Sequence, residues 1–164
     1  MASTKHRIAV AGSERAAVPG AKLVGAVNPN EQVLVTIVVR RRSGAKALTA
    51  RAMQLGSKAV AKRSYLSREA FEASHGADPK DMKAVAKFAA DNGLQVVESS
   101  AAQRRVVLSG TVAAVSKAFG VFLARYQHES GTYRGRQGEI LIPKALEGEP
   151  HALARCAQGV ELGR

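Results

Sequence analysis

The chain has 164 residues, of which 46% are hydrophobic, and its 25 basic and 13 acidic side chains give a net charge of +12. This length and hydrophobic content suit one domain with a buried core and exclude wholesale disorder, and no apolar run approaches the roughly 20 residues that a membrane span needs. The single cysteine excludes an internal disulfide, and the excess of basic residues favours an acidic partner.

Residues 1–30 predict an extended N-terminal arm, because Gly, Pro, Ala and Asn are frequent there and no hydrophobic period is sustained. No apolar signal region follows the first residues. The strongest strand signal comes next, in the run 33–39. This run is apolar on both faces except at Thr36, which is typical of a central strand.

Residues 43–77 predict a helical insertion. Its first helix is indicated by four residues at helical spacing: Ala45, Leu48, Ala52 and Leu55. A basic connector at 58–63 follows. Ser67 is then typical of an N-cap, and the His-Gly pair at 75–76 is typical of a helix end.

The helix with the clearest signals follows the insertion. Asp78 is a good N-cap, Pro79 suits the first helical position, and the Asn-Gly pair at 92–93 ends the helix. Two strands, 94–99 and 104–109, are predicted to pair with each other across a polar turn.

A second helix at 111–119 and a strand at 121–128 complete the regular part of the chain. Gly120 between them is typical of a left-handed helix cap. Residues 140–142 predict a short C-terminal edge strand, and His151–Cys156 predicts a last short helix.

The order strand, helix, strand, strand, helix, strand is that of the split βαβ, or ferredoxin-like, arrangement. The sequence therefore predicts an α+β domain at 31–160 in which two helices cover one face of an antiparallel sheet.

The predicted strands carry apolar residues on both faces. In the first strand, Leu34 and Val38 lie opposite a set of four: Val33, Val35, Ile37 and Val39. In the last strand, Val121 and Leu123 lie opposite a set of three: Phe122, Ala124 and Tyr126. Two helices can cover only one face. The other face is therefore either an interaction surface or is covered by the arm and the insertion.

Four stretches carry a resemblance to a known family: LSREAFEASHGAD at 66–78, VVLSGTV at 106–112, AFGVFLARY at 118–126 and TYRGRQGEILIP at 132–143. Together with GSER, PGA, NPNE and RRR in residues 12–42, they resemble the activation domain of the kumamolisin-like sedolisins, which are serine-carboxyl peptidases made as precursors. The resemblance implies a propeptide with a ferredoxin-like core, similar to subtilisin propeptides.

The resemblance also implies a role. Such a propeptide would help the peptidase domain to fold, inhibit it in the zymogen and be cut away under acidic conditions. The catalytic Ser, Glu and Asp and the calcium site of the family belong to the peptidase domain, so no catalytic residue and no cofactor is expected in this chain. Secretion as part of a precursor is implied too. Residues 161–164 would begin the linker to the peptidase domain, and a free-standing inhibitor of the same fold is the alternative.

The uncovered face and the positive charge indicate where a peptidase domain, in cis or in trans, would bind. The expected peptidase-facing residues are apolar strand residues and nearby arginines: Phe122, Ala124, Tyr126, Leu34, Thr36, Val38, Arg104, Arg105, Arg134 and Arg136. We expect the arginines to pair with carboxylates of the peptidase, which lose their charge at about pH 4 and release the domain. His75, His128 and His151 are expected to be solvated surface histidines.

A basic ferredoxin-like module could instead bind RNA, and a domain of this fold could bind a small molecule. An RNA-binding sheet needs a strand rich in aromatic and basic residues, and Val106–Leu108 is unlike one. No ligand or metal motif is visible. Nucleic acid and membrane are therefore not expected as partners.

Overall fold

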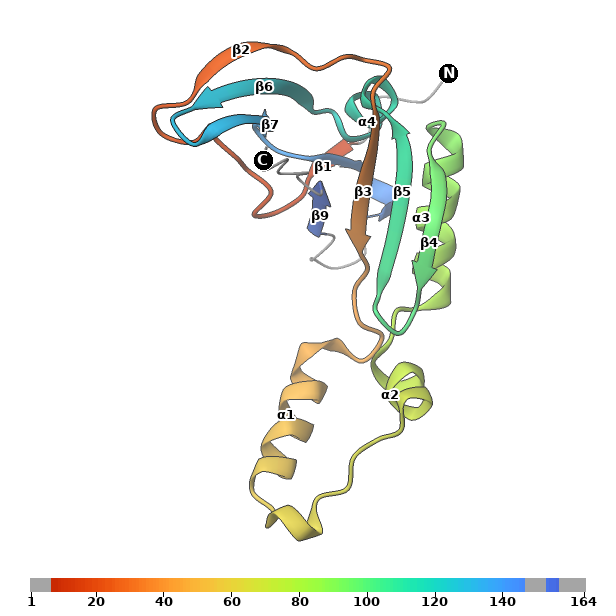
Figure 1. Cartoon of the computed structure of the whole chain (residues 1–164). Helices are drawn as coiled ribbons and strands as arrows, with labels where there is room; N and C mark the ends of the chain where they lie inside the picture. The colour runs from red at the N-terminus through yellow and green to blue at the C-terminus, as the bar shows by residue number, and fades with distance from the viewer. Residues whose placement is uncertain (1–6, 147–152, 157–164) are drawn as a thin grey trace.

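The computed structural model describes residues 7–146 and 153–156 of the chain (Figure 1). In chain order its elements are β1 Arg7–Ala9, β2 Lys22–Ala26, β3 Gln32–Val38, α1 Gly44–Gly56, η2 Val60–Lys62, α2 Arg68–His75, α3 Pro79–Asp91, β4 Gln95–Ser100, β5 Arg105–Thr111, α4 Val112–Phe119, β6 Phe122–His128, β7 Gly131–Gln137, β8 Leu141–Pro143, η3 Lys144–Leu146 and β9 Leu153–Cys156. The fold is α+β with antiparallel sheets, as the sequence predicts.

The core follows the ferredoxin-like order β3, α3, β4, β5, α4, β6, with the insertion between β3 and α3. Its main sheet has the strand order β4-β5-β3-β9. α3 packs on β4 and β5, and α4 packs on β3 and β5. The rings of Phe88 and Phe119 meet at 5.4 Å, edge to face, so the two helices share one face of the sheet. The predicted ferredoxin-like class is thus confirmed.

The sheet face under these helices forms the hydrophobic core. Six strand side chains there are buried: Val33, Val35, Ile37, Val39, Val106 and Leu108. They pack with Val115 and Phe119 of α4 and Phe88 of α3 in one cluster. The alternation of buried and half-exposed residues along β3 and β5 follows from the period of two of a β-strand.

One predicted strand lies elsewhere. β6 is not part of the main sheet, because both of its edges are already paired, with β2 on one side and β7 on the other. β6 and β7 form a hairpin across the turn before Gly131. Because this pairing closes only a small loop, it costs little conformational entropy of the chain. The prediction that strand 121–128 completes the main sheet is wrong.

A second correction concerns the end of the chain. The prediction of a helix at His151–Cys156 is wrong for residues 153–156, which form β9 and pair with β3 from Val35 to Val38. β3 would otherwise present an unpaired edge, and the hydrogen bonds of this ladder outweigh the local helix preference. His151 lies outside the described residues.

The helix ends agree with the sequence. The side chain of Asp78 accepts a hydrogen bond from the backbone N–H of Lys80 at 2.8 Å, and Ser67 accepts one from Ala70 at 3.1 Å. Gly120 ends α4 with φ 63°, the left-handed conformation that glycine adopts without strain. Capping signals are local, which is why the sequence locates them well.

The N-terminal arm is paired with the rest of the fold. β1 pairs with β8, which is the predicted C-terminal edge strand, and β2 pairs with β6. Between them, Ser13 is buried and accepts a hydrogen bond from the backbone N–H of Ile140 at 2.9 Å. The described part of the arm thus contributes two strands to the fold.

The insertion (residues 43–77) extends away from the end of the main sheet (Figure 1). α1 has no buried residue. The junction with the core holds His75, which is buried at 6% exposure, shares a 2.8 Å hydrogen bond with Ser43 and lies 5.0 Å from the ring of Phe71. The expectation that His75 is a solvated surface residue is wrong, because α2 ends in the narrow junction between insertion and core.

Candidate functional site

The side of the β3–β5 ladder that faces away from α3 and α4 is the candidate site, and we call it the outer face. The antiparallel register places three residue pairs on it: Leu34 with Ser109, Thr36 with Val107 and Val38 with Arg105. Directly opposed residues of an antiparallel pair lie on the same side of the sheet. The site is therefore built by two strands that are far apart in sequence.

The outer face is accessible, and its apolar residues Leu34, Val38 and Val107 alternate with polar ones. Leu34 is 48% exposed although it lies in a central strand, and the other five residues are half-buried. On the opposite face, Val35 and Leu108 are almost fully buried. Both helices that pack on this sheet in the described part of the chain lie on that opposite face.

The β4 edge of the outer face adds further apolar surface. β4 is exposed from Gln95 to Ser99, with Val97 at 61%, and a β-bulge lies between Val96 and Glu98. Beside it, Glu98 forms an ion pair with Arg105. The site therefore combines exposed aliphatic side chains with one ion pair at its rim.

Positive charge gathers at the end of the outer face that leads into the insertion. Arg104 has φ 55° and is fixed to β3 by its guanidinium, which donates to the carbonyl of Val39 at 3.0 Å. Burial, and then the charge of Arg41, lower the pKa of Arg104 from its ordinary value. An arginine remains charged under such conditions. This end of the site would therefore attract a carboxylate.

The structure separates the three predicted site residues of β6 by their exposure. Phe122 is 64% exposed, but Ala124 and Tyr126 are buried. The ring of Tyr126 stacks on Tyr133 at 5.4 Å, and the hydroxyl of Tyr133 accepts a hydrogen bond from the backbone N–H of Val18. Because β6 belongs to the second sheet, these residues do not extend the outer face.

The two remaining predicted arginines bond within the chain. Arg134 forms an ion pair with Glu31, and Arg136 donates to the carbonyls of Ser13 and Gly138, both at 2.5 Å. The bond to Ser13 ties the arm to β7, and the ion pair with Glu31 ties β7 to the residue before β3. Of the four predicted arginines, the structure brings Arg104 and Arg105 to the end of the outer face.

The sequence left open whether the arm and the insertion cover the second face of the main sheet. The arm reaches the hydroxyl of Tyr133 beside the second sheet, whereas the insertion extends beyond the end of the main sheet instead of folding over it (Figure 1). Sequence reasoning missed Val107, Ser109 and Val97 as site residues. The pairing of β3 with β5 would have identified the first two, and the position of β4 at the edge of the sheet, which exposes Val97, leaves no local signal.

No three His, Cys, Asp or Glu side chains gather closely enough to hold a metal ion within residues 7–146 and 153–156. In the same described part of the chain, no helix is long and apolar enough to cross a membrane.

Comparison with known proteins assigns a family to this arrangement. The chain is 38% identical over 142 residues to kumamolisin from Bacillus sp. (strain MN-32), and the match covers 87% of this chain and 26% of that protein. It is 29% identical over 150 residues to tripeptidyl-peptidase sed5 from Aspergillus fumigatus, covering 82% of this chain and 26% of that protein. The chain therefore spans about a quarter of the length of these relatives.

Residues 19–152 match the family described as "Pro-kumamolisin, activation domain". This range includes the whole ferredoxin-like core, the insertion and the outer face. The chain therefore belongs to the family of pro-kumamolisin activation domains.

Proposed function

We propose that this domain is the propeptide of a serine-carboxyl peptidase, that it assists the folding of the peptidase domain, and that it inhibits that domain until acid releases it. It contributes no catalytic residue. The observation that carries the proposal is the outer face, a sheet surface on which Leu34 is 48% exposed beside half-buried Val38 and Val107. Apolar side chains left accessible side by side on a sheet face are typical of a protein–protein interface.

The proposed partner surface is apolar at its centre and acidic at one end. Leu34, Thr36 and Val107 would contact apolar side chains of the peptidase, for example on the exposed face of a helix. At the cationic end, Arg104 would meet a carboxylate, and Arg105 would do so by exchanging its present partner Glu98. Nucleic acid is not proposed as a partner, because β5 presents Val107 and Ser109 on the outer face in place of aromatic rings.

Acid release follows from this charge arrangement. A carboxylate that pairs with Arg104 or Arg105 in the complex has its pKa lowered there, so the complex is stabilised above the ordinary carboxylate pKa of about 4. The stabilisation is lost as the pH falls through the lowered value. Secretion as part of a precursor and a calcium site on the peptidase domain complete the proposal.

Inhibition tests the proposal directly. The chain is mixed with the separated peptidase domain of kumamolisin, and peptide hydrolysis is followed at neutral pH and at about pH 4. We expect inhibition at neutral pH that weakens at the lower pH. Absence of inhibition at neutral pH would contradict the proposed function, and pH-independent affinity would contradict the release mechanism.

A pair of variants assigns the inhibition to the outer face. Leu34→Glu places a charge at its centre and should raise the inhibition constant by at least about tenfold, which corresponds to about 1.4 kcal/mol. Leu23→Glu on β2 makes the same change at a residue that is 61% exposed outside the outer face, and it should have little effect. Equal effects of the two variants would place the interface elsewhere.

A further inference from the structure

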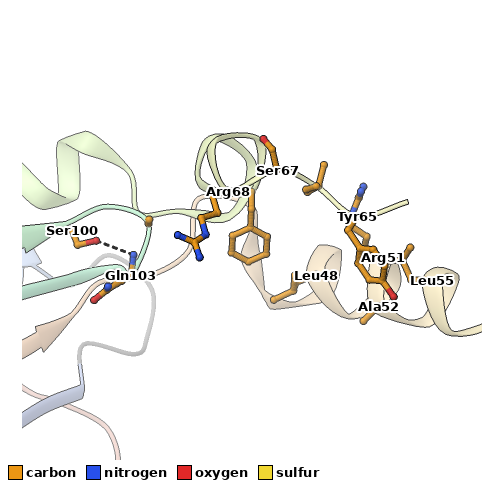
Figure 2. Close-up of a pocket in the computed structure, with 12 residues that line it drawn as sticks. Leu48, Arg51, Ala52, Leu55, Tyr65, Ser67, Arg68, Ser100 and Gln103 are labelled. Carbon is orange, nitrogen blue, oxygen red and sulfur yellow. Dashed lines mark hydrogen bonds between the residues drawn. The ribbon is translucent and has the colours of Figure 1, made fainter. Parts of the chain in front are cut away.

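A groove lies within the insertion, away from the outer face. It has a volume of about 760 Å³ and runs between α1, α2 and the turn that joins β4 to β5. Figure 2 shows Leu48, Ala52 and Leu55 on the side of α1 that faces Tyr65 and Arg68. The groove is of the size that buries several side chains of a ligand.

The walls of the groove are apolar, although the insertion has little core of its own. Leu48, Ala52 and Leu55 recur at helical spacing along one face of α1, and Leu66 and Phe71 line the other wall. None of these five side chains is buried. Among the described residues, no third element packs between the facing apolar sides of these two helices to complete a small helical cluster.

The insertion carries more positive than negative charge, and its only two acidic residues, Glu69 and Glu72, lie on α2. Residues 43–68 contain no Asp or Glu and six cationic residues: Lys46, Arg51, Lys58, Lys62, Arg63 and Arg68. Each ion pair between described residues lies outside the insertion. Arg63 donates only to the main-chain carbonyls of Lys58 and Gly56. Glu69 and Glu72 offset two of the six charges, which leaves the insertion with an excess of positive charge for an acidic ligand.

Two of these cations line the groove itself. Arg51 is half-buried on α1 and Arg68 is exposed at the start of α2. Neither guanidinium bonds to another group in the described part of the chain. A ligand that fits the groove therefore has an apolar side for its walls and acidic groups for Arg51 and Arg68.

We propose that this groove binds an acidic amphipathic helix presented by a partner protein. α1 has 13 residues and is about 20 Å long, so it can contact several turns of a third helix. Leucine-like side chains at i, i+3, i+4 and i+7 of that helix fill the groove, and flanking carboxylates pair with Arg51 and Arg68. The site is separate from the outer face, and its occupancy does not depend on the proposed propeptide function.

Probe peptides test the proposal on the full chain. The first probe is a labelled, end-capped peptide of about 15 residues with leucines along one helical face and glutamates elsewhere. The second has lysine in place of each glutamate, and the third has the composition of the first in an order that forms no apolar face. Fluorescence anisotropy should show binding of the first probe at about 10 μM and much weaker binding of the other two.

Matched variants locate the bound probe. Arg51→Glu reverses a charge that lines the groove and should weaken binding by at least about tenfold, whereas Lys46→Glu on the same helix, outside the groove lining, should change it by less than about twofold at physiological salt. Leu55→Glu and Met53→Glu form a second pair, because Leu55 lines the groove and Met53 is 71% exposed on α1 outside it. Circular dichroism of each variant checks that the chain remains folded.

Three outcomes would overturn the proposal. The first is no binding of the glutamate probe, and the second is equal sensitivity of binding to Arg51→Glu and Lys46→Glu. The third is that the chain binds phosphatidylglycerol-containing vesicles or single-stranded RNA instead of the probe. In that outcome Arg51→Glu would weaken the binding of the vesicles or the RNA by at least about tenfold. None of these outcomes affects peptidase inhibition through the outer face.

Discussion

In the core, Leu108 and Val115 lie almost fully buried between the sheet and its helices, whereas α1 in the insertion has no buried residue. The core arginines Arg40, Arg105 and Arg134 each pair with a carboxylate of the chain. The cations of the insertion form no such pair among the described residues. Two regions of one chain thus differ both in burial and in charge balance.

This difference indicates which interactions stabilise each region. The core is stabilised by burial of apolar surface that residues distant in sequence bring together. The insertion depends on local terms, namely the Ser67 cap and the main-chain bonds of its helices, and on its junction at His75. We therefore expect the insertion to open independently of the core.

Hydrogen exchange should show the largest contrast. Amides of α1 should exchange through local opening with a free energy at least about 3 kcal/mol below that of amides in β3 and β5, which exchange only on global unfolding. Native-state exchange measured by NMR or mass spectrometry checks this. Equal protection of α1 and β5 would mean that the two regions unfold as one unit.

Truncation of a leucine should destabilise the chain more in the core than in the insertion. Leu108→Ala removes a fully buried side chain and should lower the free energy of unfolding by about 2–5 kcal/mol. Leu55→Ala in the groove is the matched change, and it should lower the global value by less than about 1 kcal/mol. Urea unfolding followed by circular dichroism measures both. Similar losses would contradict the separation of the regions.

The junction should be sensitive to a single added methyl group. A Cβ at Gly76 would lie 2.5 Å from the carbonyl oxygen of Glu72 and 3.0 Å from that of Ala101. Gly76→Ala should therefore destabilise the chain by about 1–3 kcal/mol and increase exchange in α2.

Gly56→Ala is the control for the junction, because a Cβ there meets nothing within 4 Å. It lies at the end of α1 and should be neutral or stabilise the helix by up to about 1 kcal/mol. Thermal unfolding compares the two variants. A neutral Gly76→Ala would show that the junction relaxes freely.

The smallest effect is a pH dependence within the insertion. A hydrogen bond from its own backbone N–H, and then one from the Ser67 hydroxyl, lower the pKa of Glu69 below 4.5. The lowered pKa means that ionised Glu69 stabilises the start of α2 above its ordinary pKa, and that this contribution is lost as the pH falls through the lowered value.

Glu69→Gln should remove that pH dependence, and Glu72→Gln, the same change on the same helix, should leave it in place. The chemical shifts and exchange rates of the α2 amides between neutral and acidic pH measure it. An unchanged pH profile in Glu69→Gln would contradict the assignment of the effect to Glu69.

Much of the local structure could be read from the sequence. Caps at Ser67, Asp78 and Gly120 are determined by residues next to each other, so the helix ends were predicted correctly. The alternation in β3 identified Leu34, Thr36 and Val38 as one face. The chain order of the core then gave the ferredoxin-like class.

Strand partners could not be read in the same way. β6 and β9 lie in places that the sequence did not predict, because each is selected by an edge that another part of the chain leaves open. Ala124 and Tyr126 are buried for the same reason, since β6 entered the second sheet. Burial of a strand residue depends on its neighbours in space.

The sequence by itself determined the class of the fold, the helices with their caps, the excess positive charge and the resemblance to activation domains. Only the tertiary structure decided which apolar face stays open, which arginines are already paired within the chain, and that the insertion holds a cationic groove. Local hydrogen bonds and hydrophobic periods depend on residues that are close in the sequence. Exposure and ion pairing depend on distances between residues far apart in the chain, which packing alone sets.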